Sequence, residues 1–367
     1  MKKIALVGGG SGGHVYPLVA VAEELKKSSD IQLQFIGDDT LIKREAVALD
    51  IKFKRVLAPK WRRYFSAANF LDVWKLPLGI LQAFFHLWLF MPDVIFIKGS
   101  YASFLPALIG RLFLIPLVVH ESDAVPGRTN LFFGKRAKKI FVALETAKKY
   151  FPAGAVEFVG NPIRAEILSD SDPASARTHF TLNPNQPTVL ITGASQGAKA
   201  LNDVLLLAAV ELVKKFQIIH QAGPDNFTDV ERELKKIIAE GEGSYGPGLA
   251  AGYRLHPSFE VGEMTLAYSA ADVVVCRAGS SIFEIAAHGK PMVLVPLPNS
   301  AAEHQLANAR EAAKFGAIIV EQANLTPHIL INEIENAYQN RQAIGGKIKG
   351  LARVDAAAAI ANLLLNV

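Results

Sequence analysis

Glycine-rich turns between a strand and a helix are the segments of this sequence that could do chemistry. The first turn runs from Gly8 to His14 and leads into a helical stretch, Pro17 to Lys26. Glycines let the backbone approach a ligand closely, and the N–H groups at a helix start favour negative charge. The turn therefore predicts an anionic ligand, and the position of His14 at the ligand-facing end of a strand favours a functional role over simple packing.

Two further turns have the same placement. The second, Gly193 to Gly197, contains Ser195, which offers a side-chain hydrogen bond. The third, Arg277 to Ser281, opens a helix that carries Glu284. Small hydroxyl residues and bare N–H groups at a helix start suit a diphosphate. A carboxylate one turn into the helix can accept hydrogen bonds from both hydroxyls of a ribose, so Glu284 is a candidate ribose ligand.

A nicotinamide dinucleotide is an alternative ligand for the first turn. Gly8, Gly10 and Gly13 fit the dinucleotide fingerprint. Asp38 and Asp39 follow the second predicted strand, where that fingerprint places a ribose-binding acid. The histidine after the glycines and the other phosphate-suited turns weigh against this alternative, which the sequence leaves open.

The turns need rigid elements to position them, and the sequence predicts a parallel α/β architecture. Continuous apolar strands separated by amphipathic segments are typical of a sheet covered by helices on both faces. The predicted strands of the first half are Ile4 to Val7, Ile31 to Ile36, Val94 to Ile97, Leu117 to His120, Lys139 to Val142 and Val156 to Val159. Those of the second half are Thr188 to Thr192, Phe216 to His220, Asp272 to Cys276 and Pro291 to Pro296.

The alternation stops at a loop-like segment, Ser169 to Pro187, and then restarts. A chain of 367 residues also exceeds what one core usually organises. We therefore expect two doubly wound domains, residues 1–162 and 163–349, whose sheets direct their carboxyl ends toward a common cleft. The alanine- and leucine-rich segment within 350–367 predicts a final helix, for which packing back on the first domain is one option.

Composition excludes several classes of protein. Half of the residues are hydrophobic and 20% are charged, which excludes disorder and fibrous repeats. The single cysteine, Cys276, rules out a disulfide framework and gives no support to a thiolate metal cluster. The apolar run after Met1 is too short for a signal peptide, and the run Leu76 to Met91 falls short of the roughly 20 residues that a membrane-spanning helix needs.

The formal charge of +5 is unevenly distributed. Residues 1–162 hold 22 Lys and Arg against 13 Asp and Glu, a formal +9, and the remainder holds 17 against 21, a formal −4. Basic residues gather in Lys52 to Arg63 and in Lys135 to Lys139. Such clusters suit anionic lipid headgroups or a phosphorylated substrate. Nucleic-acid binding is the weakest option, because no recognition module accompanies the basic runs.

Together these segments resemble the MurG family of bacterial cell-wall glycosyltransferases over nearly the whole chain. The matching motifs are Gly9 to His14 with Pro17, Lys98 to Ser103, His120 to Asp123, Pro126 and Gly127 with Asn130, Val159 to Arg164, Gly193 to Ala198, His220 to Gly223, Glu284 to Ala287, His304 and Gln305, and Asn308 and Ala309. No one of these motifs is decisive, and the resemblance rests on their order and spacing.

The resemblance implies a GT-B glycosyltransferase fold, with an N-terminal domain for a lipid acceptor and a C-terminal domain for UDP-N-acetylglucosamine. It implies an inverting transfer of N-acetylglucosamine to the C4 hydroxyl of undecaprenyl-pyrophosphoryl-N-acetylmuramyl-pentapeptide (lipid I), which gives lipid II of peptidoglycan. His14 is then the catalytic base or a residue that positions the acceptor. No cofactor and no metal are expected. Besides the two substrates, the implied partners are the anionic membrane surface, at the cytoplasmic face of the cell membrane, and cell-wall synthesis proteins.

The resemblance also assigns individual residues. Donor contacts are expected from Arg164, Ser195, Val261, Ser280, Ser281, Glu284 and Gln305. Acceptor contacts, or support of the acceptor domain, are expected from Ser11, Gly12, Gly13, Tyr101, Glu121 and Asn130. Val261 is assigned to the uracil, Glu284 to the ribose and Gln305 to the transferred sugar. The stretch Trp61 to Phe65 and the segment Phe70 to Met91 resemble the part of the family that faces the membrane, so peripheral association is expected.

The sequence departs from the family pattern at a few positions, and most of these changes are mild. Ser100 stands where the family usually has glycine. The turn from Arg277 to Glu284 is one residue shorter than the pattern, which would rotate Glu284 by about 100° around its helix unless the helix start shifts to compensate.

Three other functions stay open on the same fold. A UDP-N-acetylglucosamine epimerase would lack the acceptor-side aromatic and basic surface and would convert the donor without a lipid. A lipid glycosyltransferase could use a diacylglycerol acceptor instead. A non-catalytic scaffold is the third alternative, and the presence of His14, Arg164 and Glu284 argues against it.

Overall fold

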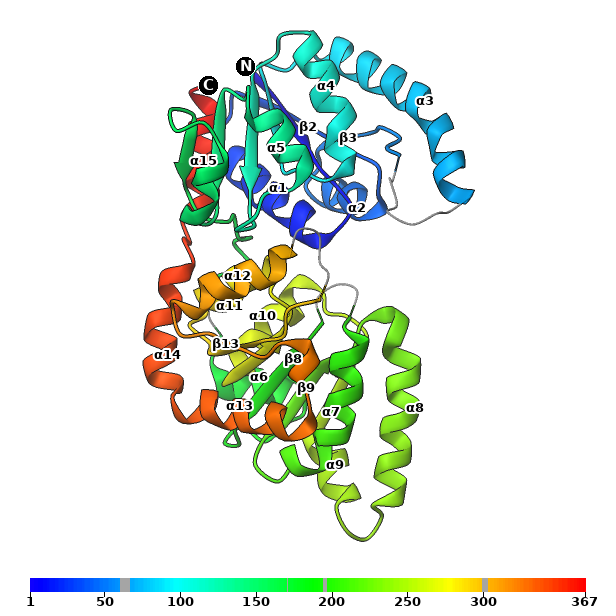
Figure 1. Ribbon diagram of the computed structural model, residues 1–367, viewed down its shortest axis with the longest axis vertical. Helices are drawn as coiled ribbons and strands as arrows, with labels where there is room; N and C mark the ends of the chain where they lie inside the picture. The colour runs from blue at the N-terminus through cyan, green and yellow to red at the C-terminus, as the bar shows by residue number, and fades with distance from the viewer. Residues whose placement is uncertain (60–66, 170, 194–196, 299–302) are drawn as a thin grey trace. The chain divides into compact units, whose positions relative to one another are not determined.

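The computed structural model describes residues 1–59, 67–169, 171–193, 197–298 and 303–367, except the side chains of residues 67–73. The chain forms two compact units, Met1–Arg164 with Arg353–Val367, and Ala165–Ala352 (Figure 1). Each unit contains one parallel sheet with helices packed on it. This is the α/β architecture that the strand pattern predicts.

The sheet of the first unit has the strand order β3-β2-β1-β4-β5-β6-β7, and all its pairs are parallel. Its strands are β1 (Lys2–Val7), β2 (Ile31–Gly37), β3 (Lys52–Arg55), β4 (Val94–Ile97), β5 (Leu117–Glu121), β6 (Lys139–Val142) and β7 (Val156–Phe158). The central strand β4 is apolar and wholly buried because helices cover both faces of the sheet.

Two layers of helix enclose this sheet. The helices are α1 (Gly12–Leu25), α2 (Thr40–Ala48), α3 (Ala67–Phe90), α4 (Phe104–Leu112), α5 (Arg128–Gly134) and α15 (Ala356–Leu365), with 3₁₀ turns η1 (Tyr101–Ser103) and η2 (Glu145–Tyr150). Successive residues of β1 point to opposite faces. Ile4 and Leu6 pack in a core with α1, α2 and α15, whereas Ala5 and Val7 pack in a core with α3, α4 and α5.

The C-terminal helix α15 belongs to the first unit. It packs on α1, and Ile360 and Leu364 are fully buried in the core of that face. The Lys2 ammonium also donates a hydrogen bond to the Leu365 carbonyl at 2.6 Å. The two ends of the chain are thereby joined in one unit, as the labels N and C in Figure 1 show.

The sheet of the second unit has the order β10-β9-β8-β11-β12-β13, again entirely parallel. Its strands are β8 (Thr188–Thr192), β9 (Gln217–Gln221), β10 (Tyr253–His256), β11 (Val273–Cys276), β12 (Met292–Leu294) and β13 (Ile318–Ile319). Its helices are α6 (Pro173–His179), α7 (Lys199–Leu212), α8 (Pro224–Glu240), α9 (Gly246–Gly252), α10 (Val261–Ala270), α11 (Ser281–Ala287), α12 (His304–Ala313), α13 (Pro327–Gln339) and α14 (Arg341–Ile348), with η5 (Gln322–Asn324) and η6 (Lys349–Leu351). Valines of β8, β11 and β12 pack with α7 and α13 in one core.

The structure corrects the sequence-based elements at several points. Helix α1 begins at Gly12 rather than Pro17, so the end of the first turn is the first turn of the helix. The segment predicted as a loop contains α6, because Asp172 caps its start by accepting the Ser175 N–H at 2.8 Å. Strands β3, β10 and β13 lie outside the predicted strands. All three are sheet edges, where a short or polar sequence gives little apolar pattern.

The strand order places the motifs at the ligand-binding end of each sheet. In the first unit β2 and β3 lie on one side of the neighbouring pair β1 and β4, and the strands that follow β4 lie on the other side. In the second unit the strands are arranged in the same way around the neighbouring pair β8 and β11. Folds of this kind bind ligands at the carboxyl ends of such a strand pair. The first glycine turn follows β1 and the segment from Lys98 follows β4, while the second and third turns follow β8 and β11.

Candidate functional site

Asp39 holds the first glycine turn in place. Its Oδ2 accepts a hydrogen bond from the Gly10 N–H at 2.7 Å, and its Oδ1 accepts one from the Ile42 N–H at 3.0 Å, where Asp39 caps α2. A Cβ added to Gly9, whose φ is 150°, would lie 2.3 Å from Asp39 Oδ2. Glycine is therefore required where the turn meets the carboxylate.

The neighbouring Asp38 is also engaged by the protein itself. Its Oδ1 lies 2.9 Å from Nε of Arg55, and its Oδ2 accepts the Ala58 N–H at 3.0 Å. The two acids that a dinucleotide would use for its ribose thus hold the turn, the start of α2 and the segment after β3. This arrangement removes the main support for the nicotinamide alternative.

The start of α1 is suited to an anion. Ser11 is the N-cap residue in an extended conformation, and its side chain makes no capping hydrogen bond. Its carbonyl accepts the N–H groups of His14 at 3.0 Å and Val15 at 3.1 Å. The first N–H groups of a helix have no partner within the helix, so those of Gly12 and Gly13 can donate to an oxyanion that approaches the turn.

Two of the predicted side chains lie beside this helix start. A Cβ on Gly10 would be 3.2 Å from the Tyr101 ring, so that ring lies against the turn. Arg164 belongs to the first unit, where its guanidinium carbon lies 3.8 Å from the centroid of the Tyr16 ring of α1. The resemblance assigns Arg164 to the donor, and this assignment stays a prediction.

One hydrogen bond sets the tautomer of His14. Its Nδ1 lies 3.2 Å from the Lys98 carbonyl oxygen, which can only accept, so Nδ1 carries the proton. In the neutral ring the lone pair is then on Nε2, the nitrogen on the far side of the imidazole. The neutral ring of His14 therefore presents an unprotonated Nε2, the atom that a general base needs.

Glu121 and Asn130 support the loop after β5. Glu121 accepts hydrogen bonds from the N–H groups of Asp123 at 2.9 Å and Gly127 at 3.0 Å, and from Nδ2 of Asn130 at 2.9 Å. The Asn130 amide also donates to the His120 carbonyl at 3.0 Å. Glu121 and Asn130 are each 3% exposed, and this burial favours support of the acceptor domain over direct contact with a substrate.

Lys98 places a buried charge beside this loop. Burial lowers the pKa of the Lys98 ammonium to about 8, although the carboxylates of Glu121 and Asp123 oppose the shift. Burial likewise raises the pKa of Glu121 to about 7, with Asp123 adding to the shift and Lys98 opposing it. Within the described residues Lys98 Nζ has no hydrogen-bond partner. The protonation of Lys98 and Glu121, and with it their combined charge, therefore changes near neutral pH.

The third turn closes tightly onto α11. The N–H of Ile282 donates to the Gly279 carbonyl at 3.2 Å, and the N–H of Phe283 donates to the Ser280 carbonyl at 3.3 Å. These bonds join residues three apart, which is the tighter 3₁₀ pattern. The helix thus starts immediately at Ser281, and the half-buried Ser280 and Ser281 stand at its amino end, where an anion is favoured.

Glu284 lies one turn into α11 and contacts α10. Its Oε2 accepts a hydrogen bond from the Tyr268 hydroxyl at 3.0 Å. Glu284 is half-buried, whereas Tyr268 is 1% exposed. At the other end of α10, Val261 is the first helical residue and is half-buried, and a capping box of Glu260 and Glu263 fixes the helix start.

Gln305 is oriented by the loop after β12. Its Oε1 accepts the Leu297 N–H at 2.8 Å, which fixes the orientation of the amide. Arg277 holds the same loop, because its guanidinium donates to the Val295 carbonyl at 2.9 Å and to the Gln322 side chain at 2.8 Å. Asn308 lies on α12, the helix that follows this loop. Its amide donates a hydrogen bond to the Ala278 carbonyl at 3.1 Å, which links α12 to the third turn.

Some predictions fall outside the described residues. Ser195 of the second glycine turn and the stretch Trp61 to Phe65 are among them. Within the ranges that the structure describes, no group of three or more His, Cys, Asp or Glu side chains is placed to hold a metal ion.

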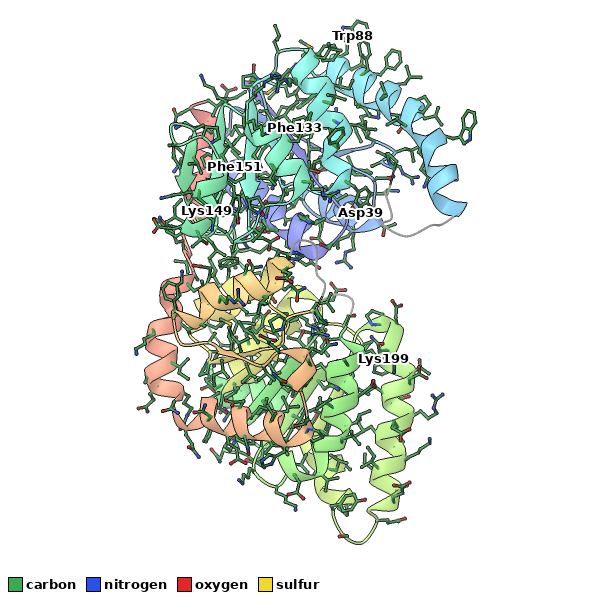
Figure 2. All side chains as sticks on the ribbon, in the orientation of Figure 1. Asp39, Trp88, Phe133, Lys149, Phe151 and Lys199 are labelled. Atoms are coloured by element: carbon green, nitrogen blue, oxygen red, sulfur yellow. The ribbon has the colours of Figure 1, made fainter. Side chains whose placement is uncertain are left out.

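The first unit has an apolar surface on α3, α4 and α5. Figure 2 shows the Trp88 side chain pointing outward from α3, and 56% of it is exposed. The other exposed apolar side chains of this surface are Trp74, Leu76, Leu78, Ile80, Leu81, Phe84, Phe85, Leu89, Met91, Leu108, Leu112 and Phe132. The exposed Lys135 and Arg136 follow α5 directly. A surface this rich in exposed apolar side chains marks an interaction site.

None of the helices that the structure describes has both the length and the apolar character needed to cross a membrane.

Sequence reasoning missed Tyr268 and the roles of Lys98 and Asp39. Tyr268 lies in an apolar helix, where an aromatic residue is ordinarily part of a core. Lys98 was noted only as part of a motif, although a lysine directly after a buried strand is a signal that could have drawn attention to it. Asp39 stood out as a ribose ligand, and only the turn packed against it reveals its supporting role.

Comparisons with known proteins agree over both units. Residues 4–142 match the glycosyltransferase family 28 N-terminal domain, and residues 188–363 match the glycosyltransferase family 28 C-terminal domain. The proteins named UDP-N-acetylglucosamine–N-acetylmuramyl-(pentapeptide) pyrophosphoryl-undecaprenol N-acetylglucosamine transferase of Treponema denticola and Clostridium kluyveri are each 32% identical to this chain. The alignments cover 98% of this chain and 94% of the Treponema protein, and 99% of this chain and 99% of the Clostridium protein.

Solved structures give the same result. The crystal structure of Acinetobacter baumannii MurG matches with a TM-score of 0.73 and 28% identity over 100% of both chains. The UDP-GlcNAc 2-epimerase of Neisseria meningitidis, bound to UDP-GlcNAc, matches with a TM-score of 0.69 over 100% of both chains, but at 15% identity. The likeness to the epimerase concerns the fold alone.

Proposed function

The chain belongs to glycosyltransferase family 28, and on this premise we propose that it transfers N-acetylglucosamine from UDP-N-acetylglucosamine to the C4 hydroxyl of lipid I, giving lipid II for peptidoglycan synthesis. It is a UDP-N-acetylglucosamine-dependent glycosyltransferase with the two doubly wound units of the GT-B fold. The assignment of roles to individual residues rests mainly on one observation. His14 is held in one tautomer at the end of a glycine turn, and that turn is itself suited to an anion.

On the acceptor side, the N–H groups of Gly12 and Gly13 at the start of α1 bind the diphosphate of the lipid, and Tyr101 packs beside it. His14 Nε2 takes the proton from the C4 hydroxyl as the oxygen attacks the anomeric carbon. The Lys98 carbonyl supports this step, because its bond to Nδ1–H strengthens when the ring becomes an imidazolium.

On the donor side, Glu284 accepts hydrogen bonds from the ribose, and the backbone at Val261 contacts the uracil. Ser280 and Ser281, at the start of α11, donate to the diphosphate, and Gln305 contacts the transferred sugar. Charge that develops on the departing UDP is stabilised by these donors and by the helix start. Attack from the face opposite the leaving UDP inverts the anomeric centre and gives a β-1,4 link. Arg164, on the first unit, adds a cation to the donor diphosphate or sugar.

The test is transfer of radiolabelled N-acetylglucosamine from its UDP donor to a short-chain lipid I analogue. We expect the parent protein to make labelled disaccharide lipid, and His14→Ala to lower kcat by about 10²–10⁴, the usual contribution of general-base catalysis. His328→Ala, an exposed histidine of α13, is the matched control and should keep parental activity. Activity within a few-fold of the parent in His14→Ala would exclude His14 as the base.

A pH profile separates catalysis from positioning. If His14 is the base, the low-pH limb of kcat should flatten in His14→Ala. If the limb is unchanged and only the KM for the acceptor rises, His14 positions the acceptor instead.

The exposed apolar surface of the first unit supports peripheral binding at the cytoplasmic face of an anionic membrane. Aromatic and aliphatic side chains bury in the interface while basic residues contact the headgroups. We expect Trp88→Glu combined with Leu89→Glu to lower binding to vesicles that contain anionic lipid. Leu207→Glu, which alters an equally exposed leucine on α7 of the second unit, should leave that binding unchanged. Equal loss in both variants would contradict the assignment of this surface.

A further inference from the structure

One hydrogen bond connects two helices of the second unit that carry proposed donor contacts. The Tyr268 hydroxyl of α10 donates to Glu284 Oε2 of α11 at 3.0 Å. Tyr268 is among the largest fully buried side chains, whereas Glu284 is partly accessible. A buried phenol therefore holds a carboxylate that a ligand can reach.

The position of Tyr268 is itself fixed from several sides. Its ring packs against the His288 ring with the centroids 5.4 Å apart, and His288 Nε2 donates to the Ile167 carbonyl at 2.7 Å. Three residues before Tyr268 on α10, the Thr265 hydroxyl donates to the Glu166 carbonyl at 3.1 Å. Helices α10 and α11 and residues 166–167 thus fix the direction in which the phenol presents its hydroxyl.

The geometry of α10 relates Tyr268 to the nucleoside. Val261, assigned to the uracil, and Tyr268 are seven residues apart, so they lie on the same face of the helix about two turns from each other. The face of α10 that begins at Val261 is therefore the one that contacts Glu284. Helix α10 therefore links the segment proposed to contact the uracil to the carboxylate proposed to bind the ribose.

Fixing Glu284 in advance has an energetic consequence. A glutamate side chain loses conformational entropy when it is ordered, and this loss opposes binding. If Tyr268 orders it before the donor arrives, that cost does not weaken donor binding. The bond also determines the direction of Glu284 on a helix that starts directly at the third turn.

We propose that Tyr268 is a positioning residue for the donor ribose: its hydroxyl orients Glu284 so that the carboxylate accepts hydrogen bonds from the ribose hydroxyls. This inference rests on the proposed function, in which Glu284 binds the ribose. A carboxylate has about four acceptor sites, so Glu284 can accept from Tyr268 and from the ribose together.

The experiment measures binding of UDP and of 2′-deoxy-UDP to the full-length protein by competition with the donor. It compares the parent with Tyr268→Phe, Glu284→Gln, the double variant and Tyr338→Phe, a tyrosine of α13 that packs on Phe216 and serves as the control. We expect Tyr268→Phe to weaken binding of UDP about tenfold, the value of a hydrogen bond to a charged group, and to weaken binding of 2′-deoxy-UDP less, because that nucleotide offers Glu284 only its 3′-hydroxyl. In the Glu284→Gln background the same change should have no further effect on the binding of either nucleotide.

Two results would overturn the proposal and are distinguishable. In the first, Glu284→Gln abolishes the preference for UDP over 2′-deoxy-UDP, but Tyr268→Phe either weakens both nucleotides equally or weakens neither. Glu284 then binds the ribose and Tyr268 only packs. If Glu284→Gln leaves the preference for UDP unchanged, the ribose assignment itself fails, and the role of Tyr268 fails with it.

Discussion

Asp39→Ala should weaken both the first unit and its proposed acceptor site. The variant removes the cap of α2, worth typically about 1 kcal/mol, and a charge-assisted hydrogen bond to the Gly10 N–H, worth about 1.5–3 kcal/mol. We therefore expect a loss of about 3 kcal/mol of unfolding free energy in this unit. Because the glycine turn loses its support, the KM for the lipid acceptor should rise several-fold, while the KM for the donor, whose proposed contacts lie mainly in the second unit, stays unchanged.

Asp172→Ala is the matched control, because Asp172 also caps a helix, α6, but touches no proposed substrate contact. It should cost only about 1 kcal/mol and leave both KM values unchanged. Urea denaturation followed by hydrogen exchange of β1 and β8 measures the two units separately. The reasoning is refuted if Asp39→Ala destabilises its unit no more than Asp172→Ala does, or if the donor KM rises in place of the acceptor KM.

Three other outcomes are expected. Ser100→Gly should stabilise the first unit by roughly 1 kcal/mol in urea denaturation, because Ser100 has φ 74° and ψ 166°, a region suited to glycine; destabilisation would contradict this. Lys98→Met should abolish a rise in stability between about pH 8 and 10: in that range the unfolded chain binds the Lys98 proton and the folded chain does not, so the parent gains up to about 1.4 kcal/mol per pH unit. An unchanged slope in Lys98→Met would exclude Lys98 as its source. Transferase activity measured with EDTA should equal activity without it, and a loss restored by Mg²⁺ would show that a metal is needed.

Local patterns in the sequence determined the main architecture. Buried parallel strands read as continuous apolar runs, so β1, β4, β6, β8 and β11 could be located from the sequence alone. The glycine turns were equally visible, since glycine and a following helix are neighbours in the chain. The edge strands β3, β10 and β13 and the true start of α1 could not be read in this way, because none of them has a distinctive apolar period.

Contacts between distant residues depended on the tertiary structure. Asp39 supports Gly10 across 29 positions, and the Lys98 carbonyl sets the tautomer of His14 across 84. Tyr268 reaches Glu284 only because α10 and α11 pack beside each other, and α15 completes the first unit from the far end of the chain. Sequence periodicity fixes which face of an element is buried, whereas the order of strands in the sheet decides which elements become neighbours, and these contacts follow from that order.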